Sequence, residues 1–234
     1  MTDSNRVAVI TGGSRGLGRA LAAAMSRQGW SLIITGRDVA TLEAARSRLS
    51  TGTTVVAISG DISNPVHRDR IAAAVAELGG VDVVVNNASI LGPSPLPRLL
   101  DYPLDDLERV YRVNTAAPLA LLQSLRSAFK PGARILNITS DAGLEAYEGW
   151  GGYGSSKAAL EQISNVLATE NPELRVYWVD PGDMRTDMHQ EAFPDEDISD
   201  RPPPEESVPG LLRLIAGDLA SGRYRTADLQ EAAS

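Results

Sequence analysis

Residues 6–28 read RVAVITGGSRGLGRALAAAMSRQ, and this stretch decides the fold. The apolar run 6–11 has the composition of a buried β-strand, and the Ala- and Leu-rich stretch 16–28 has helical spacing. The glycines between them predict a strand-to-helix turn at which the backbone approaches a ligand. Free N–H groups and the helix dipole favour an anion there, and the pyrophosphate of a dinucleotide fits.

The same alternation continues along the chain to about residue 180. Apolar β-rich runs predict strands at 6–11, 31–35, 53–58, 81–86, 134–139 and 175–179. Helical spacing predicts helices at 16–28, 39–49, 65–78, 104–129, 153–170 and 205–219. Strands that alternate with helices indicate βαβ units and therefore an α/β fold around a parallel sheet. We expect a single domain over residues 1–234, with the acidic, proline-rich segment 187–209 as a mobile loop over a site.

Composition excludes several classes of function. Net charge is −8 without a long basic run, which argues against nucleic acid or an anionic membrane surface as a partner. The chain has no cysteine, and its two histidines, His67 and His189, cannot alone form a conventional zinc site, so we expect no metal. No apolar run approaches a membrane span or a signal peptide, and a cytoplasmic location is the expectation.

The glycine-rich turn also matches two rival motifs. Gly12-Gly13-Ser14-Arg15-Gly16 fits the Gly-x-Ser-x-Gly elbow of hydrolases, in which Ser14 would be the nucleophile. That elbow normally follows several strands and needs an acid and a histidine downstream. A P-loop is disfavoured as well, because Arg19-Ala20 replaces the Lys-Ser/Thr pair that holds phosphate and magnesium.

Further candidate residues follow the ends of the next predicted strands. Arg37 follows the second strand, where an arginine grips the 2′-phosphate of NADP and an acid instead selects NAD, so NADP(H) is favoured over NAD(H). Asp38 beside it is a helix cap in our interpretation. Asp61-Ile62 and Asn86-Asn87-Ala88-Ser89 end the third and fourth strands, where doubly wound sheets bind ligands.

Tyr153 and Lys157 lie four residues apart, so they share one face of the predicted helix. A neighbouring cation lowers the pKa of a phenol, which makes Tyr153 a candidate acid/base. The alternative is a half-buried tyrosine beside a solvated lysine.

Taken in order, the motifs resemble those of the classical short-chain dehydrogenase/reductase family over about residues 5–190. The matching positions are Thr11-Gly12-x-x-x-Gly16-x-Gly18, Asn86-Asn87-Ala88, Asn114, Ser140, Tyr153-x-x-x-Lys157 and Pro181-Gly182. The resemblance implies a three-layer, doubly wound Rossmann fold with Tyr153 as general acid/base. It further implies that Ser140 hydrogen-bonds the substrate carbonyl oxygen, and that Lys157 binds the nicotinamide ribose and lowers the pKa of Tyr153. Asn114 resembles the family asparagine that holds a water between the lysine and solvent.

The resemblance also implies the cofactor contacts. Thr186 would bind the nicotinamide carboxamide, and Tyr153 and Lys157 belong to the cofactor set as well. The remaining expected contacts are Gly12, Ser14, Arg15, Gly16, Leu17, Gly18, Arg37, Asp61, Ile62, Asn87, Ala88, Ser89, Pro181, Gly182 and Met184.

The chain departs from the family pattern at two places. Ser89 stands where many members have glycine, and residues 222–228 replace the glycine-rich segment that gives many relatives an edge strand and a tetramer contact. We therefore expect a homo-oligomer, with a dimer through helices 104–129 and 153–170 favoured over a tetramer. Ala117, Leu121 and Leu125 share one helical face that would either pair two chains or pack on the sheet.

The expected activity is hydride transfer between NADP(H) and a carbonyl or secondary alcohol. Segments 89–97, 141–152 and 184–200 should wall the substrate pocket. They supply Leu91, Leu144, Tyr147, Trp150, Met184, Met188 and Phe193. A non-catalytic NADP-binding redox sensor is the alternative, and the sequence does not identify the substrate.

Overall fold

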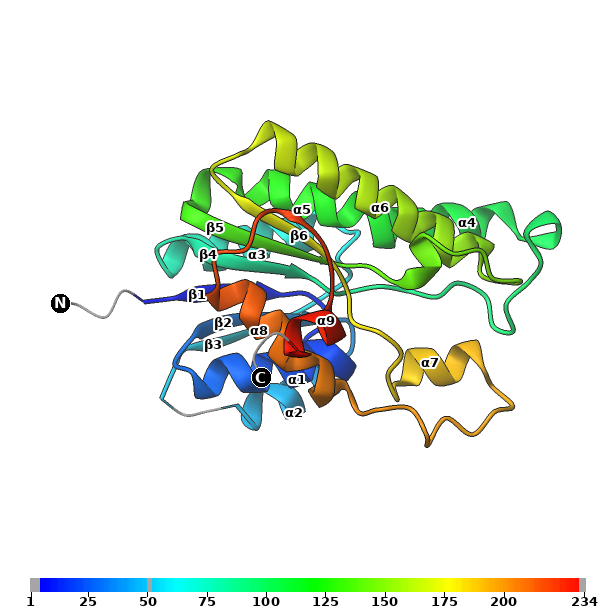
Figure 1. Ribbon diagram of the computed structural model, residues 1–234. Helices are drawn as coiled ribbons and strands as arrows, with labels where there is room; N and C mark the ends of the chain where they lie inside the picture. The colour runs from blue at the N-terminus through cyan, green and yellow to red at the C-terminus, as the bar shows by residue number, and fades with distance from the viewer. Residues whose placement is uncertain (1–4, 50–51, 232–234) are drawn as a thin grey trace.

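The computed structural model describes residues 5–49 and 52–231, and Figure 1 shows its central sheet with helices on both faces. Within these residues seven strands form one parallel sheet in the order β3-β2-β1-β4-β5-β6-β7. The strands are β1 (Val7–Ile10), β2 (Ser31–Gly36), β3 (Val55–Ser59), β4 (Val81–Asn86), β5 (Phe129–Ile138), β6 (Arg175–Asp180) and β7 (Gly222–Arg225). This is the expected doubly wound Rossmann fold.

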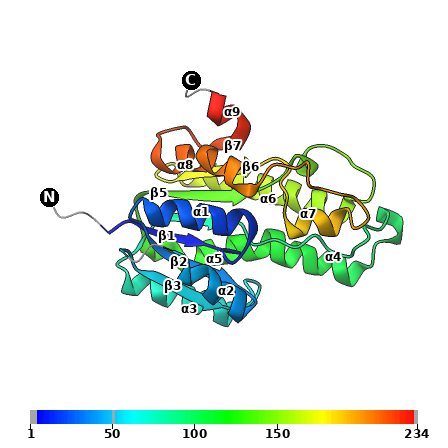
Figure 2. The same ribbon diagram turned by 90° about the horizontal axis from the view of Figure 1, so that it is seen from below.

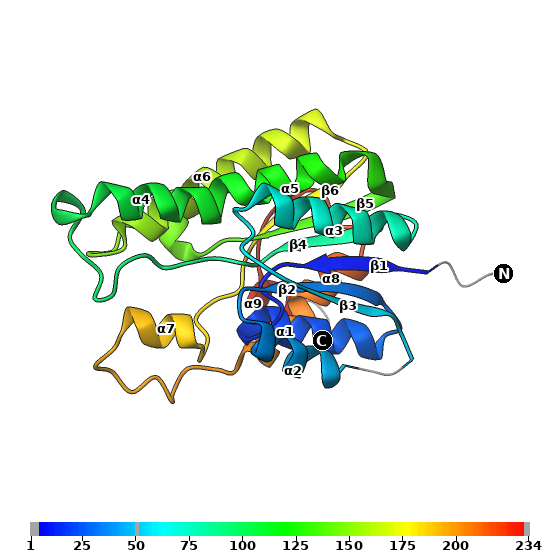
Figure 3. The ribbon, with the colours of Figure 1, turned by 180° about the vertical axis from the view of Figure 1, so that it is seen from behind.

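Helices cover the sheet on both sides. The α-helices are α1 (Gly16–Arg27), α2 (Val39–Ser47), α3 (Pro65–Glu77), α4 (Leu104–Tyr111), α5 (Ala117–Leu125), α6 (Gly151–Glu170), α7 (Asp187–Ala192), α8 (Val208–Ala216) and α9 (Thr226–Glu231). The shorter segments are η1 (Leu99–Asp101), η2 (Arg112–Ala116), η3 (Arg126–Ala128), η4 (Asp141–Gly143) and η5 (Pro204–Ser207). Helices α1, α2 and α8 lie on one face, and α3, α5 and α6 lie on the other (Figures 1 and 3).

Alternating side chains of the strands form a separate core on each face. In β1, Ala8 and Ile10 pack with residues of α1 and α8, whereas Val9 packs with residues of α3 and α5. All three residues are fully buried, because helices exclude water from both faces of the sheet. Because both faces of each strand are buried, the strands are short continuous apolar runs and could be recognised in the sequence.

The order of the strands fixes where a ligand can bind. Strand β1 pairs with β2 on one side and with β4 on the other, so the connections leave the sheet in opposite directions at this point. Such a switch opens a crevice at the carboxyl ends of the two strands. Helix α7 lies beyond this same end of the sheet (Figures 1 and 2).

The edge strand β7 corrects the expectation for the C-terminal segment. No strand was predicted after residue 179, yet Gly222–Arg225 pairs in parallel with β6 over four residues. The edge of β6 offers unpaired backbone groups, and a short polar segment can satisfy them without an apolar pattern.

The single helix expected at 104–129 is also corrected. Helix α4 ends at Tyr111, a five-residue π-helical segment η2 follows, and α5 begins at Ala117. Pro118 has no N–H, and its ring would clash with the carbonyl of Asn114 in a regular helix. The proline therefore explains a local widening of the helix at Asn114.

Other boundaries differ for local reasons. Helix α7 lies within the segment expected to be a loop, and the side chain of Thr186 caps it by accepting from the His189 N–H at 3.2 Å. The core between α5 and the sheet contains Ala117, Leu121 and Leu125, which are all buried. They therefore pack on the sheet and offer no face to a second chain. Among the described residues, no helix is long and apolar enough to cross a membrane.

Candidate active site

The glycine turn after β1 is shaped for close approach by a ligand. Gly12 has φ +67°, and a Cβ there would lie 2.8 Å from Nδ2 of Asn87. A Cβ on Gly18 would collide with the Gly12 carbonyl oxygen, because α1 begins directly against the turn. Only glycine fits at both positions, and the result is a cradle at the N-terminus of α1 where an anion is favoured.

Asn87 fastens the end of β4 to this turn. Its Nδ2 donates to the carbonyl oxygens of Thr11 (2.9 Å) and Gly12 (3.2 Å). In the other direction, Thr11 Oγ1 accepts from the backbone N–H groups of Asn87 and Ala88, both at 3.0 Å. These bonds hold the carboxyl ends of β1 and β4 in one arrangement on either side of the crevice.

Ser14 is placed differently from a hydrolase nucleophile. Its hydroxyl lies against Gly36, where an added Cβ would be 2.8 Å from Ser14 Oγ. Neither ring nitrogen of His67 has a hydrogen-bond partner in the described structure, and the Nδ1 of His189 faces Asp183 at 4.0 Å. Ser14 therefore lacks the histidine base that a serine hydrolase needs.

Arginine side chains surround the end of the crevice next to β2 and β3. Arg15 and Arg37 line it as expected, and Arg19 and Arg109 join them. Burial raises the pKa of the Asp61 carboxyl, but hydrogen bonds from Ser63 and the charges of Arg37 and Arg109 hold it below its usual value. This end of the crevice is therefore suited to a ligand phosphate.

Sequence reasoning missed Arg19 and Arg109. Arg19 lies one helical turn after Arg15, so its spacing was a usable signal. Arg109 comes from α4, far along the chain, and only the fold brings it to the crevice.

Ser140, Tyr153 and Lys157 meet at the opposite end of the crevice. Lys157 Nζ lies 5.3 Å from the centre of the Tyr153 ring and donates to the Ile138 carbonyl at 2.8 Å. Ser140 follows β5, where its Oγ donates to Asp141 Oδ1 at 2.9 Å. The rings of Trp150 and Tyr153 pack in a T-shaped arrangement, with their centroids 5.7 Å apart. The three expected residues therefore form one cluster, which we call the Tyr153 corner.

Burial controls the proton affinities in the Tyr153 corner. It lowers the pKa of Lys157 to about 7, although Glu161 raises it. Burial raises the pKa of Tyr153 above its usual range, Asp180 and Asp141 raise it further, and the Ser89 hydroxyl lowers it. Lys157 is not among the groups that shift the pKa of Tyr153 here, so the expected lowering by Lys157 stays a prediction.

Asn114 lies behind the Tyr153 corner rather than in the cavity. Its Oδ1 accepts from the Ile90 N–H at 2.9 Å, and its Nδ2 donates to the Ile90 carbonyl at 2.9 Å and to Ser156 Oγ at 3.0 Å. The amide thus joins the wall after β4 to helix α6.

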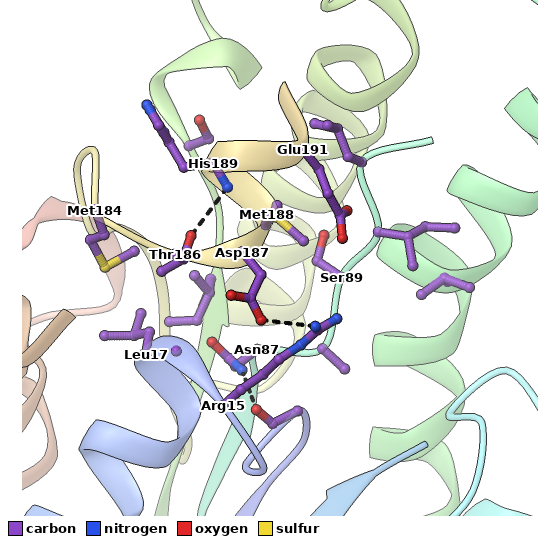
Figure 4. Close-up of a pocket in the computed structure, with 18 of the residues that line it drawn as sticks. Arg15, Leu17, Asn87, Ser89, Met184, Thr186, Asp187, Met188, His189 and Glu191 are labelled. Carbon is purple, nitrogen blue, oxygen red and sulfur yellow. Dashed lines mark hydrogen bonds and ion pairs between the residues drawn. The ribbon is translucent and has the colours of Figure 1, made fainter. Parts of the chain in front are cut away.

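The turn after β6 closes the third side of the cavity. Gly182 has φ +75°, and its N–H donates to Asp180 Oδ1 at 3.0 Å. Farther along, Arg15 NH1 and Asp187 Oδ2 form an ion pair of 3.0 Å between the glycine turn and α7, as Figure 4 shows. Met184, Thr186 and Met188 face the same pocket.

These walls enclose a cavity of about 1000 Å³, at the upper end of the range for ligand pockets. Every expected cofactor or catalytic residue lines it except Gly18, which packs against the turn, and Asn114. Of the expected substrate-pocket residues, Leu91, Trp150, Met184 and Met188 line the cavity. Leu144, Tyr147 and Phe193 do not, because the first two point to solvent and Phe193 packs on Trp150 and His189.

No group of three or more potential metal ligands occurs among the described residues. The polar groups that line the cavity are arginines, hydroxyls, amides and backbone groups of the glycine turn, together with Lys157, His189 and scattered carboxylates. These suit an organic ligand that carries phosphate.

Known proteins are similar to this chain in sequence and in architecture. The family described as short chain dehydrogenase matches residues 6–197. A 3-oxoacyl-[acyl-carrier-protein] reductase of rhamnolipid biosynthesis from Pseudomonas aeruginosa is 37% identical over 71% of this chain and 67% of its own. Sepiapterin reductase from Mus musculus is 32% identical over 80% of this chain and 77% of its own.

Solved structures agree with the sequence matches. A putative short chain dehydrogenase from Pseudomonas syringae superposes with a TM-score of 0.88 at 30% identity, covering 94% of each chain. A short chain dehydrogenase from Shigella flexneri, complexed with NADP, has a TM-score of 0.88 at 26% identity and covers 97% of this chain and 100% of its own. The chain therefore belongs to the short-chain dehydrogenase/reductase family, whose enzymes oxidise CH–OH groups or reduce C=O groups of small molecules.

Proposed function

We propose that this enzyme is an NADP(H)-dependent carbonyl reductase or alcohol dehydrogenase with Tyr153 as its general acid/base. The observation that carries the proposal is one cavity with a glycine cradle and arginines at one end and Ser140, Tyr153 and Lys157 at the other. When bound, the nicotinamide supplies the hydride. The protein then has to hold the carbonyl oxygen and deliver a proton to it.

The Tyr153 corner fits these tasks. Ser140 Oγ already donates to Asp141, and it can turn to donate to a substrate oxygen. Tyr153 gives its proton to that oxygen during reduction and takes it back during oxidation. Lys157, which lines the cavity, would hold the nicotinamide ribose and supply positive charge beside the phenolate that reduction leaves.

Asn114 suits a role in proton supply through its backbone rather than its side chain. The side chain is occupied by Ile90 and Ser156, whereas Pro118 removes the helical N–H that the Asn114 carbonyl would otherwise accept. A water on this carbonyl would join Lys157 to solvent.

The cavity fits NADP(H) better than NAD(H). Asp38 is occupied as the cap of α2, where its Oδ1 accepts from the Thr41 N–H at 2.7 Å and from the Thr41 hydroxyl at 2.6 Å. Arg37 forms no hydrogen bond or close ion pair with any described residue, so its guanidinium is available to a 2′-phosphate. The structural relative from Shigella flexneri is complexed with NADP, and a putative short chain dehydrogenase from Escherichia coli is complexed with NADPH.

A panel of ketones, aldehydes and secondary alcohols, assayed with NADPH, NADP, NADH and NAD, tests the proposal. We expect reduction of at least one carbonyl class that follows the loss of NADPH absorbance. Tight NADPH binding without turnover of any compound would favour a non-catalytic redox sensor instead.

Exchange of Arg37 tests the choice of cofactor. In Arg37→Asp the positive charge for the 2′-phosphate is lost and an acid for the ribose is gained, so kcat/KM should shift toward NADH by about 10- to 100-fold. Arg112→Asp, an exposed arginine that does not line the cavity, is the matched control. An unchanged cofactor preference in Arg37→Asp would refute the role of Arg37.

A homodimer and a cytoplasmic location stay part of the proposal. Because Ala117, Leu121 and Leu125 are buried, any pairing of α4, α5 and α6 must use their outer faces. Light scattering of the purified protein distinguishes a dimer from a monomer or tetramer.

A further inference from the structure

Side chains from two other elements hold three successive residues at the end of β5. The Ile138 carbonyl accepts from Lys157 Nζ at 2.8 Å, and the Thr139 hydroxyl donates to Glu161 Oε1 at 2.7 Å. The Ser140 carbonyl accepts from Arg223 NH2 at 3.3 Å. Lys157 and Glu161 come from α6, whereas Arg223 comes from the edge strand β7.

Arg223 also neutralises two buried acids. Its Nε donates to both carboxylate oxygens of Glu161, at 3.1 and 3.2 Å, and its NH2 lies 3.5 Å from Asp180 Oδ2. The side chains of Glu161 and Asp180 are only 9% and 4% exposed. Buried carboxylates stay charged only when cations and hydrogen-bond donors offset their lost hydration.

Both acids act on the Tyr153 corner. Glu161 lies one helical turn after Lys157, and it raises the pKa of that amine. Asp180 ends β6, and it raises the pKa of Tyr153. Without a partner, Glu161 would raise the proton affinity of Lys157 further, and Asp180 would do the same to Tyr153.

We infer that Arg223 is a positioning residue of this active site, which fixes Ser140 through its carbonyl and shields Lys157 and Tyr153 from the charges of Glu161 and Asp180. The inference rests on the proposed function, since it assigns these two residues to proton transfer. It gives the edge strand β7 a part in the chemistry, although no residue of β7 lines the cavity.

Other groups near Lys157 do not provide this charge. Asn114 and Thr115 of η2, which bond Ser156, are neutral. Arg225 Nε lies 3.8 Å from Asp180 Oδ2, but the Arg225 side chain is 60% exposed. Within the described residues it forms no hydrogen bond or ion pair with Glu161 or Ser140. The charged or titratable groups around Lys157 and Tyr153 are Glu161, which acts on the amine, and Asp141 and Asp180, which act on the phenol. Arg223 bonds both Glu161 and Asp180.

The composition of the chain permits a direct test that needs no turnover. Lys130 and Lys157 are its only lysines, and Lys130 Nζ pairs with Asp82 at 2.8 Å, far from the cavity. In protein with isotopically labelled lysine, NMR should therefore resolve two side-chain signals. Lys130 serves as the internal reference while the signal of Lys157 is followed as pH is varied.

The pKa of Lys157 should rise by at least about half a unit in Arg223→Met, because Glu161 then faces the amine without its cation. Arg225→Met, the matched control on the same strand, should leave it unchanged. In a Glu161→Gln background, Arg223→Met should no longer shift the pKa. No shift in Arg223→Met, an equal shift in Arg225→Met, or a shift that persists without Glu161 would overturn the inference.

Arg223→Gln serves if the Met variant does not fold. Glutamine keeps a donor for the Ser140 carbonyl but removes the charge, so the titration of Lys157 should still move. An unmoved titration in this variant would contradict the electrostatic part of the inference.

Kinetics separate this inference from the proposed function. With an active substrate, Arg223→Met should lower kcat about tenfold and move the pH profile toward alkaline pH, while KM changes little. An unmoved pH profile would count against Arg223 alone. If the wild-type enzyme turns over no carbonyl compound, the proposed function fails, whereas the titration still decides whether Arg223 controls Lys157.

Discussion

Two regions that face each other across the cavity are built in opposite ways. The Tyr153 corner is held by buried hydrogen bonds between residues of regular elements. Lys157, which donates to the Ile138 carbonyl, is almost inaccessible to solvent. The α7 wall, which we define as residues 183–201, is joined to the rest of the molecule by exposed ion pairs and by hydrogen bonds to backbone groups, such as that from Ser94 Oγ to the Glu191 carbonyl at 2.7 Å. Its link to the glycine turn, Arg15 with Asp187, joins side chains that are 55% and 69% exposed.

The difference concerns how each region can respond to a ligand. Removing one partner from a buried hydrogen-bonded network leaves its other members unsatisfied, so the network keeps a single geometry. An exposed ion pair contributes little, and its members can exchange partners with water or ligand phosphate. We therefore expect the Tyr153 corner to fix the reacting groups and the α7 wall to adapt to what enters.

Tyr153→Phe should have the largest effect. The substitution removes the proton donor but keeps the ring against Trp150, so turnover should fall about 10²- to 10⁴-fold while NADPH binding changes little. Steady-state kinetics and fluorescence titration of NADPH measure the two quantities.

Tyr147→Phe is the matched control for this loss. The Tyr147 phenol donates to Asp141 Oδ2 at 3.1 Å, but Tyr147 lies outside the cavity. A Tyr153→Phe enzyme that still turns over at the wild-type rate would place the proton donor elsewhere.

Asn114→Ala should break the Tyr153 corner from behind. The change leaves both backbone groups of Ile90 without their side-chain partner, so the free energy of unfolding should fall by about 1–3 kcal/mol. Urea unfolding monitored by circular dichroism gives this value. Asn165→Ala, at an exposed position of α6, should change stability by less than about 0.5 kcal/mol, and equal losses in both variants would contradict the special position of Asn114.

The sequence predicted the Tyr153 corner far better than the α7 wall. The Tyr153 corner rests on short motifs at strand ends, and a parallel sheet brings such ends together whatever the loops do. Tyr153, Lys157 and Ser140 therefore meet as the sequence indicated. Strands such as β1 are buried on both faces of the sheet, so they are continuous apolar runs that can be recognised in the sequence.

The missed features depend on tertiary structure. The residues of β7 are polar, and they form a strand because β6 has a free edge and because Arg223 finds Glu161 and Asp180. Leu144, Tyr147 and Phe193 were placed in the pocket because their segments border it, but a sequence does not tell which way a loop side chain points. The break in helix 104–129 did carry a signal, Pro118.

The pH dependence should report the buried state of the Tyr153 corner. Reduction requires the protonated phenol and falls as pH rises through the pKa of Tyr153, whereas oxidation requires the phenolate and rises with it. Since burial, Asp180 and Asp141 raise this pKa, kcat/KM for oxidation should climb about tenfold per pH unit from neutrality into the alkaline range.

Reduction should be flat below neutral pH, and a fall near neutrality should follow the loss of charge of Lys157, whose pKa is about 7, rather than the phenol. The measurement is kcat/KM in both directions with one carbonyl–alcohol pair. A decline of reduction beginning below neutral pH would mean that the phenol is acidified in the free enzyme, contrary to its surroundings here.

The smallest effect is expected at the α7 wall, from Asp187→Asn. The amide cannot pair with Arg15 as a carboxylate does, so the guanidinium becomes freer to bind a cofactor phosphate. NADPH should then bind about two- to fivefold tighter at low salt, in line with the small strength of exposed ion pairs, and the gain should disappear at high salt.

Asp200→Asn, which removes an exposed acid that pairs with Arg201 in the same wall, should not change NADPH affinity. Tighter binding that persists at high salt would mean that the wall itself has been rearranged, and weaker binding would mean that Asp187 holds the cofactor rather than competing for Arg15.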